Sequence, residues 1–115
     1  ILKLGSNIKR RFKRHVFGRL FATTIDLLFK IKAYDTQCGA KIFSNKIAEI
    51  IFKDKFTSKW IFDVELLIRI RKINQLDKVC EIPLNNWEDI KGSKIKFIDM
   101  VKLPIEISKL YLKYR

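Results

Sequence analysis

Apolar residues recur at helical spacing along most of the chain. Between Ile8 and Lys30, one ridge at i+4 spacing contains Ile8, Phe12, Val16 and Leu20, and a second contains Phe17, Phe21, Ile25 and Leu28. The same period predicts a short helix over Asn45–Phe52 and a stronger one over Asp63–Ile73. A last helix is expected over Ile95–Tyr114, with a bend where Pro104 removes a backbone donor. Four helices therefore account for more than half of the sequence.

Shorter apolar stretches between these helices predict strands. Ile1–Leu4 is stopped by a turn composition, Lys41–Phe43 follows a loop centred on Gly39, and Lys78–Leu84 is closed by Pro83. Strands separated by helices indicate an α/β fold. Three strands form too small a sheet to cover its own edges, so we expect partner strands outside this chain. Residue 1 already lies in an apolar run, and we interpret the chain as a piece of a longer domain.

Charge narrows the range of partners. The 115 residues contain 25 Lys and Arg against 12 Asp and Glu, a formal net charge of +13. Such a charge favours an anionic partner, which is nucleic acid, an anionic membrane surface or a phosphorylated substrate. No apolar run approaches the ~20 residues that a membrane-spanning helix needs. The cysteines, Cys38 and Cys80, are expected to be small apolar thiols, because their spacing fits no zinc motif.

Two places in the chain are candidates for chemistry. Asp63 and Glu65 stand at the start of a helix, where a carboxylate is either functional or simply stabilised by the helix dipole. The loop from Asp35 to Lys41 contains Gln37 and Cys38 around a glycine, a composition that fits either a binding loop or a structural turn. From the residues alone, both readings of both places stay open.

Five motifs in order resemble one family. They are Gly5-Ser6, Asp35-Thr36-Gln37-Cys38-Gly39-x-Lys41-x-Phe43, Trp60-x-Phe62-Asp63-Val64-Glu65-Leu66-Leu67, Glu81-Ile82-Pro83-Leu84, and Trp87 with Gly92-Ser93-Lys94. Together they cover nearly the whole chain and resemble the dolichyl-phosphate glucosyltransferase branch of the family 2 glycosyltransferases. The resemblance implies the C-terminal, acceptor-side half of a GT-A domain, a Rossmann-like nucleotide-diphospho-sugar transferase, over residues 1–115. The nucleotide-binding half would then be missing from this chain.

The implied activity is transfer of a hexose, expected to be glucose, from a nucleotide sugar to a polyprenyl or dolichyl phosphate at a membrane surface. A divalent metal, Mg or Mn, is expected in the full-length enzyme, with ligands in the missing half. The resemblance also implies a peripheral location at the cytoplasmic face of a membrane and no nucleic-acid partner. The isolated chain is expected to be inactive.

The resemblance also suggests roles for particular residues. Asp35, Gln37 and Lys41 match the loop that lines the sugar and acceptor side of the pocket. Trp60 and Asp63 match the position of the catalytic carboxylate, and Glu65 is expected to orient it.

A second group of positions is expected to contact phosphate. Ser93 and Lys94 match a loop that closes over the diphosphate. Asn7 stands where the family usually has a phosphate-binding Arg, so either Arg10, Arg11 or Arg14 replaces it or the affinity for phosphate is reduced.

Two alternatives from other classes remain. Lys and Arg interleaved with aromatic residues also occur in nucleic-acid-binding modules, although no recognition motif is present. The second alternative is a membrane-peripheral domain without catalytic activity.

Overall fold

The computed structural model describes residues 7–9, 12–88 and 97–115, with side chains from 16 to 85 and from 101 to 115. Its elements in chain order are β1 (Asn7–Lys9), α1 (Phe12–Phe29), α2 (Asn45–Ile51), α3 (Phe62–Lys72), the 3-10 turn η1 (Leu76–Lys78), β2 (Asn86–Glu88) and α4 (Phe97–Tyr114). Most of the described residues are therefore helical or irregular. Among them, no helix combines the length and apolar content needed to cross a bilayer.

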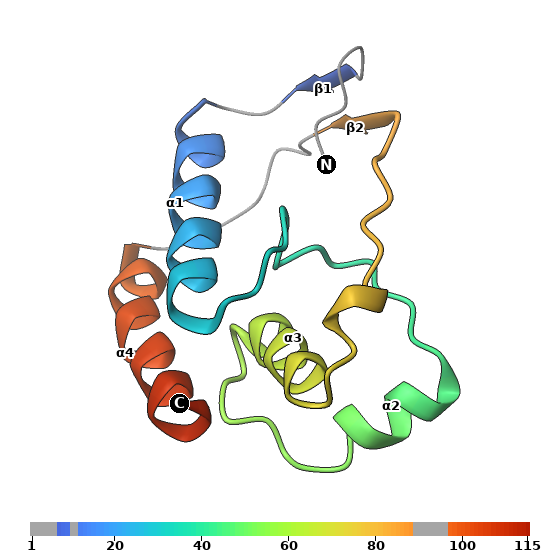
Figure 1. The fold of residues 1–115 in the computed structure, drawn as a ribbon. Helices are drawn as coiled ribbons and strands as arrows, with labels where there is room; N and C mark the ends of the chain where they lie inside the picture. The colour runs from blue at the N-terminus through green and yellow to red at the C-terminus, as the bar shows by residue number, and fades with distance from the viewer. Residues whose placement is uncertain (1–6, 10–11, 89–96) are drawn as a thin grey trace.

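Helix α3 is the centre of the structure. In Figure 1, α1 and α4 lie on one side of it and α2 lies on the other. Nearly all of its apolar side chains are buried, including Val64, Leu66, Leu67, Ile68 and Ile70. A helix whose side chains are buried around most of its circumference lies in the core, and the other three helices pack around this one.

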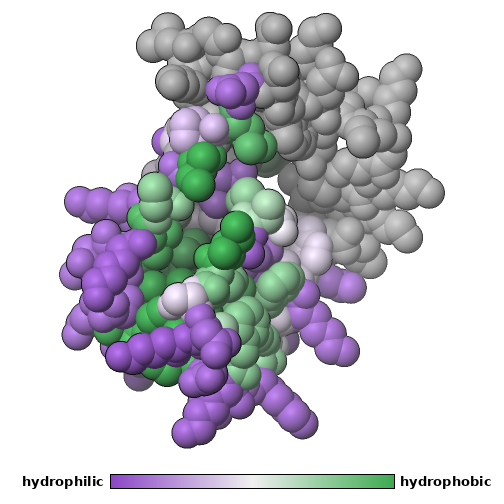
Figure 2. All heavy atoms as spheres, turned by 90° about the vertical axis from the view of Figure 1, so that its right-hand side faces the viewer, coloured by the Kyte–Doolittle hydropathy of each residue, from purple (hydrophilic) through white to green (hydrophobic). Residues whose placement is uncertain are grey.

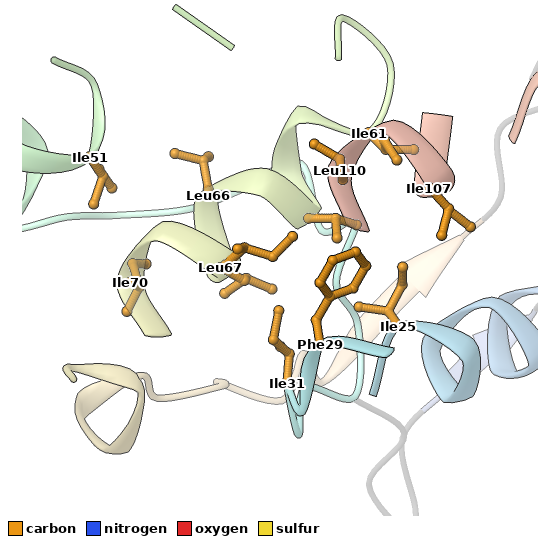
Figure 3. Packing of buried hydrophobic residues seen from close by; sticks show 12 residues of the cluster. Ile25, Phe29, Ile31, Ile51, Ile61, Leu66, Leu67, Ile70, Ile107 and Leu110 are labelled. Carbon is orange, nitrogen blue, oxygen red and sulfur yellow. The ribbon is translucent and has the colours of Figure 1, made fainter. Parts of the chain in front are cut away.

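The hydrophobic core joins residues that are far apart in the sequence. Ile25 and Phe29 of α1 meet Leu67 of α3, and Ile107 and Leu110 of α4 close the same cluster (Figure 3). Ile25 and Leu110 are fully buried. Full burial of one such side chain stabilises a fold by about 1.5–3 kcal/mol, so these contacts account for the docking of the two long helices.

The strands form a single short pair. β1 and β2 are parallel, with Asn7 opposite Asn86 and Lys9 opposite Glu88. They lie at one end of the molecule, above the helices in Figure 1. Within the described residues, the expected α/β character is limited to this pair.

Two predicted strands are wrong. Residues 41–43 and 79–84 have no regular structure, and only Lys78, the first residue of the second predicted strand, belongs to η1. Their apolar side chains are exposed instead: Ile42 is 100% accessible and Ile82 is 78% accessible. A strand forms only when its backbone pairs with a neighbour, and neither segment has such a neighbour among the described residues. The first predicted strand, Ile1–Leu4, lies outside the described residues.

The helix predictions were closer to the structure. α2 and α3 begin and end within one residue of the predicted bounds. α4 is one helix through Pro104. The first helix was predicted from Ile8, but Ile8 and Lys9 pair with β2 and the helix begins at Phe12. Pairing with β2 therefore decides the structure of Ile8, although Ile8 fits the helical spacing of the apolar ridge.

Candidate functional site

The loop from Tyr34 to Lys41 is held in place by the carboxylate of Glu81. The backbone N–H of Tyr34 donates to both carboxylate oxygens of Glu81, each at 3.0 Å, and the N–H of Asp35 donates to Oε1 at 3.0 Å. Glu81 is half-buried and stands 46 residues further along the chain. A charged acceptor of backbone N–H groups gives stronger hydrogen bonds than a neutral one, so Glu81 fixes where this loop begins.

Inside the loop the chain folds back on itself. The Asp35 carboxylate accepts a hydrogen bond from the N–H of Gln37 at 3.2 Å, an Asx turn. The Cys38 thiol donates to the Ala40 carbonyl at 3.4 Å, and the Lys41 ammonium donates to the Cys38 carbonyl. These bonds turn the Lys41 side chain back across the loop, while Gln37 stays exposed.

Lys41 also pairs with the first turn of α3. Its Nζ lies 2.8 Å from Oδ1 of Asp63, and the two side chains are only 18% and 16% exposed. Solvent screens a pair at this depth less than a surface pair. The structure therefore brings together two of the predicted site residues that lie 22 positions apart.

The start of α3 is held by Ser58. Its side-chain oxygen accepts from the N–H of Trp60 at 3.2 Å and from the N–H of Ile61 at 3.0 Å, and the residue is 1% exposed. The hydroxyl thus satisfies two backbone N–H groups in the turn that precedes α3. Ser58 thus fixes the turn that carries Asp63. Trp60, in this turn, remains 42% exposed.

α1 brings one cation to the loop. The guanidinium carbon of Arg19 lies 4.6 Å from the centre of the Tyr34 ring, which is a stacked cation–π arrangement. Tyr34 is directly followed by Asp35. Arg19 therefore lies near the start of the Asp35–Lys41 loop, and the sequence had suggested no role for it.

Glu65 does not orient Asp63, contrary to expectation. It is fully buried and accepts hydrogen bonds from Tyr114 Oη at 2.7 Å and from the Thr57 N–H at 2.7 Å. Arg69 Nη2 lies 3.0 Å away and Lys113 Nζ lies 3.2 Å away. Residues two apart on a helix point in different directions, so Asp63 faces the loop while Glu65 faces α4.

These contacts change the acidity of Glu65. Burial by itself would raise its pKa, but hydrogen bonds from Tyr114, Thr57, Arg69 and Lys113 outweigh burial and lower the pKa from 4.5 to about 2. The carboxylate is therefore ionised at neutral pH and holds α4 against α3. Its role is structural.

Not every predicted site residue can be placed. Arg10, Ser93 and Lys94 lie outside the described residues. Arg14 belongs to α1, but its side chain is not described. The phosphate-binding roles expected of these four residues stay predictions, and the predicted site residues with described side chains are Asp35, Gln37, Lys41, Trp60 and Asp63.

The described residues do not fit a divalent metal. Among them, no group of three His, Cys, Asp or Glu side chains lies together. Asp63 is engaged by the Lys41 ammonium, whereas hard cations prefer several oxygen ligands. The arrangement instead presents a carboxylate and an ammonium side by side, which suits hydroxyl groups and phosphate oxygens.

Sequence reasoning missed Glu81 and Arg19. Glu81 belonged to a motif of the resemblance, but no role was inferred for it. The one signal was a carboxylate among apolar residues in Val79-Cys80-Glu81-Ile82. Arg19 was one of many cations in the first helix, and only the packing of α1 beside Tyr34 distinguishes it.

Comparison with known proteins found relatives over almost the entire chain. A dolichyl-phosphate beta-glucosyltransferase of Trichomonas vaginalis is 33% identical over 110 residues, which is 96% of this chain and 33% of the relative. That of Saccharomyces cerevisiae is 37% identical over 110 residues, covering 93% of this chain and 31% of the relative. That of Dictyostelium discoideum is 32% identical over 107 residues, covering 92% of this chain and 32% of the relative.

The chain thus spans about a third of the length of these curated relatives. No protein-family profile matches it. No solved structure matches it either.

Proposed function

Since the chain is homologous to the dolichyl-phosphate beta-glucosyltransferases, we propose that it supplies the acceptor side of a glucosyltransferase of that family. The observation that carries this proposal is the Lys41–Asp63 ion pair, which is partly buried beside the Asp35–Lys41 loop. The substrates proposed are a nucleotide-activated glucose and a polyprenyl or dolichyl phosphate.

The reaction needs little proton transfer. An oxygen of the lipid phosphate bonds to the anomeric carbon of glucose, and the bond from that carbon to the nucleoside diphosphate breaks. The attacking oxygen is already anionic, so it requires little help from a general base. What the site must provide is positive charge and correct placement for two phosphate-bearing groups.

The described residues can divide these tasks. The Lys41 ammonium offsets negative charge at the acceptor phosphate, and the Asp63 carboxylate orients that ammonium and accepts a hydrogen bond from a sugar hydroxyl. Asp35 and Gln37 present oxygen and nitrogen atoms to the same sugar. Trp60, exposed three residues before Asp63, offers an apolar ring face on which a sugar can stack.

A divalent metal belongs to the proposal as a group bound elsewhere in the enzyme. Bound there, it would stabilise the charge on the departing diphosphate. The described residues offer no fitting ligand set, so every role proposed for them is independent of the metal.

We also propose that residues 1–115 form the acceptor-side part of a larger GT-A domain. The segments 40–43 and 79–84 run along the side of the molecule that faces the viewer in Figure 2. Apolar residues gather over the middle of that face, with polar residues at its left and lower margins. Exposed Ile42, Val79, Ile82 and Leu84 belong to these segments. Unpaired backbone with apolar side chains is what an adjoining strand requires.

A chimera tests the proposed function. Residues of this chain replace the matching third of the Saccharomyces cerevisiae relative, and transfer of radiolabelled glucose from UDP-glucose to dolichyl phosphate is measured. The chimera is expected to be active, whereas the 115-residue chain alone is expected to transfer nothing. An inactive chimera that folds, or transfer by the isolated chain, would contradict the proposal.

Single substitutions in the chimera test the site. Asp63→Asn, Asp35→Asn and Lys94→Ala are each expected to lower transfer at least tenfold, because a lost charge contact at a transferring group costs about 2–4 kcal/mol. Asp77→Asn is the matched control, since Asp77 is an exposed carboxylate in the first turn of η1. Unchanged transfer in Asp63→Asn would remove that residue from the site.

A further inference from the structure

A hollow lies at the opposite end of α3 from Asp63. It has a volume of about 500 Å³ and is lined by the last residues of three helices and the residues just beyond them: Leu28, Phe29, Lys30, Arg71, Lys72, Asn74, Tyr111, Tyr114 and Arg115. An 11-residue helix is about 16 Å long. The hollow is therefore separate from the Lys41–Asp63 site.

The hollow is strongly basic. Lys30, Arg71, Lys72 and Arg115 line it, and no Asp or Glu side chain does. Among the described residues, none of these four side chains forms an ion pair with a carboxylate. Three helix ends contribute about half a negative charge each. Four cations exceed that total by more than two charges, so helix-dipole compensation does not account for them.

The backbone at Lys30 supports a role for its side chain. Lys30 has φ = 51°, in the left-handed region that favours glycine. Asn74, two residues after the end of α3, has φ = 53°, but Asn is a common residue at that position. A lysine at the end of α1 retains an unfavourable backbone conformation that glycine would relieve. The charge that the lysine side chain brings to the hollow is a reason to keep lysine at this position.

The hollow has an apolar rim. Leu28 and Tyr111 line it and are both 41% exposed. Their neighbours in the sequence, Leu27 and Leu112, do not line it and are 77% and 67% exposed. Leu27 continues a row of exposed side chains with Val16 and Leu20 on the side of α1 away from the core. On α4, Val101, Ile105 and Leu112 repeat that spacing.

We propose that this hollow binds the phosphate of an anionic phospholipid head group, with the apolar rim inserted into the bilayer interface. Cations in a concave site match a phosphate, and exposed leucines beside them match the acyl boundary of a membrane rather than water or nucleic acid. In Figure 1, α1 and α4 lie on the same side of α3, and the exposed row of each helix faces away from the core. This inference does not depend on glucosyl transfer.

Binding to vesicles tests the proposal. The 115-residue chain is mixed with vesicles of phosphatidylcholine alone or with 30 mol% phosphatidylserine (about a third anionic lipid), and bound protein is measured by sedimentation. The triple variant Lys30→Gly, Arg71→Gln, Lys72→Gln is expected to bind the anionic vesicles roughly 100-fold more weakly, following the contribution of each basic residue at a membrane surface.

The matched control removes the same charge elsewhere. Lys46→Gln, Lys53→Gln, Lys59→Gln also lowers the net charge by three, from exposed positions that do not line the hollow. Its binding is expected to fall at most fivefold. If the two triple variants lose vesicle binding equally, net charge alone explains the binding, and the proposal is overturned. Thermal unfolding of each variant confirms that it is folded.

Two further measurements separate the sources of phosphate. Leu27→Asn with Leu112→Asn is expected to weaken vesicle binding at least tenfold but to leave binding of soluble inositol hexakisphosphate unchanged. If vesicle binding survives this change, the apolar rim has no role and the membrane proposal fails. If the basic triple variant loses duplex RNA binding but not vesicle binding, the surface is a nucleic-acid site instead.

Lys30→Gly alone distinguishes binding from stability. Because glycine adopts a positive φ freely, this variant is expected to unfold at the same temperature as wild type or higher, yet to bind anionic vesicles about fivefold more weakly. A variant with unchanged binding would show that Lys30 has no part in the site.

Discussion

At the residue scale, α3 separates two carboxylates with different tasks. Asp63 and Glu65 stand two positions apart. Asp63 forms a partly buried ion pair with Lys41, whereas Glu65 is buried against α4. Sequence alone could identify both as helix-start acids. It could not tell which one faced the core, because that depends on where α4 packs.

The depressed pKa of Glu65 predicts a specific acid sensitivity. The unfolded chain binds a proton at Glu65 near pH 4.5, and the folded chain only near pH 2. Its stabilisation is therefore complete above pH 4.5 and is lost as the pH falls towards 2. The pKa difference corresponds to about 3 kcal/mol.

Glu65→Gln tests this dependence by chemical unfolding followed with circular dichroism. The variant is expected to be about 3 kcal/mol less stable at pH 7, because Arg69 and Lys113 lose their charged partner. The difference should vanish near pH 2. Glu49→Gln, an exposed position on α2, should change stability by less than about 0.5 kcal/mol. A constant difference at all pH values would contradict this account.

At the element scale, sequence periodicity located the helices but not the strands. Helix α3 was predictable because its apolar pattern and its bounds are local properties of 62–72. The β-like run at 79–84 was misassigned because strand formation depends on a partner distant in sequence. The side chain of Glu81, which belongs to this run, instead holds the loop at Tyr34. The two residues are 47 positions apart, so no local sequence pattern could predict the contact.

This link predicts how the loop responds to loss of Glu81. In Glu81→Ala, the amide protons of Tyr34 and Asp35 should exchange with solvent about 10–100 times faster, since hydrogen bonds to a charged group are worth about 1.5–3 kcal/mol. Hydrogen exchange measured by NMR gives the rates. Asp77→Ala, on the neighbouring η1, should leave them unchanged. Equal rates in wild type and Glu81→Ala would show that other contacts hold the loop.

At the scale of the whole molecule, the core lies between the helices and much apolar surface remains outside it. Ile42 and Ile82 are among the most exposed apolar residues described. The sequence predicted partner strands outside this chain, because three strands form too small a sheet to cover its own edges. It could not show which apolar residues the helices leave exposed.

The exposed segments predict opposite behaviour in two settings. Ile42→Thr with Ile82→Thr should change the unfolding free energy of the 115-residue chain by less than about 0.5 kcal/mol per site. In the chimera with the yeast relative, the same change should lower the unfolding temperature and glucosyl transfer, because these side chains are then covered. Ile50→Thr on α2, 47% exposed, is the control. If the chimera tolerates the double change, the segments do not pack against the rest of that domain.

The contacts of Glu65 also set an order of events during translation. Thr57, Ser58 and Arg69 emerge from the ribosome together with Glu65, but Lys113 and Tyr114 follow 48 and 49 residues later. A nascent chain that has presented only α1 to α3 therefore holds an acid that is half-satisfied and a core still open where Ile107 and Leu110 belong. The domain can complete its folding only when α4 has been synthesised, and until then its interior is accessible to chaperones.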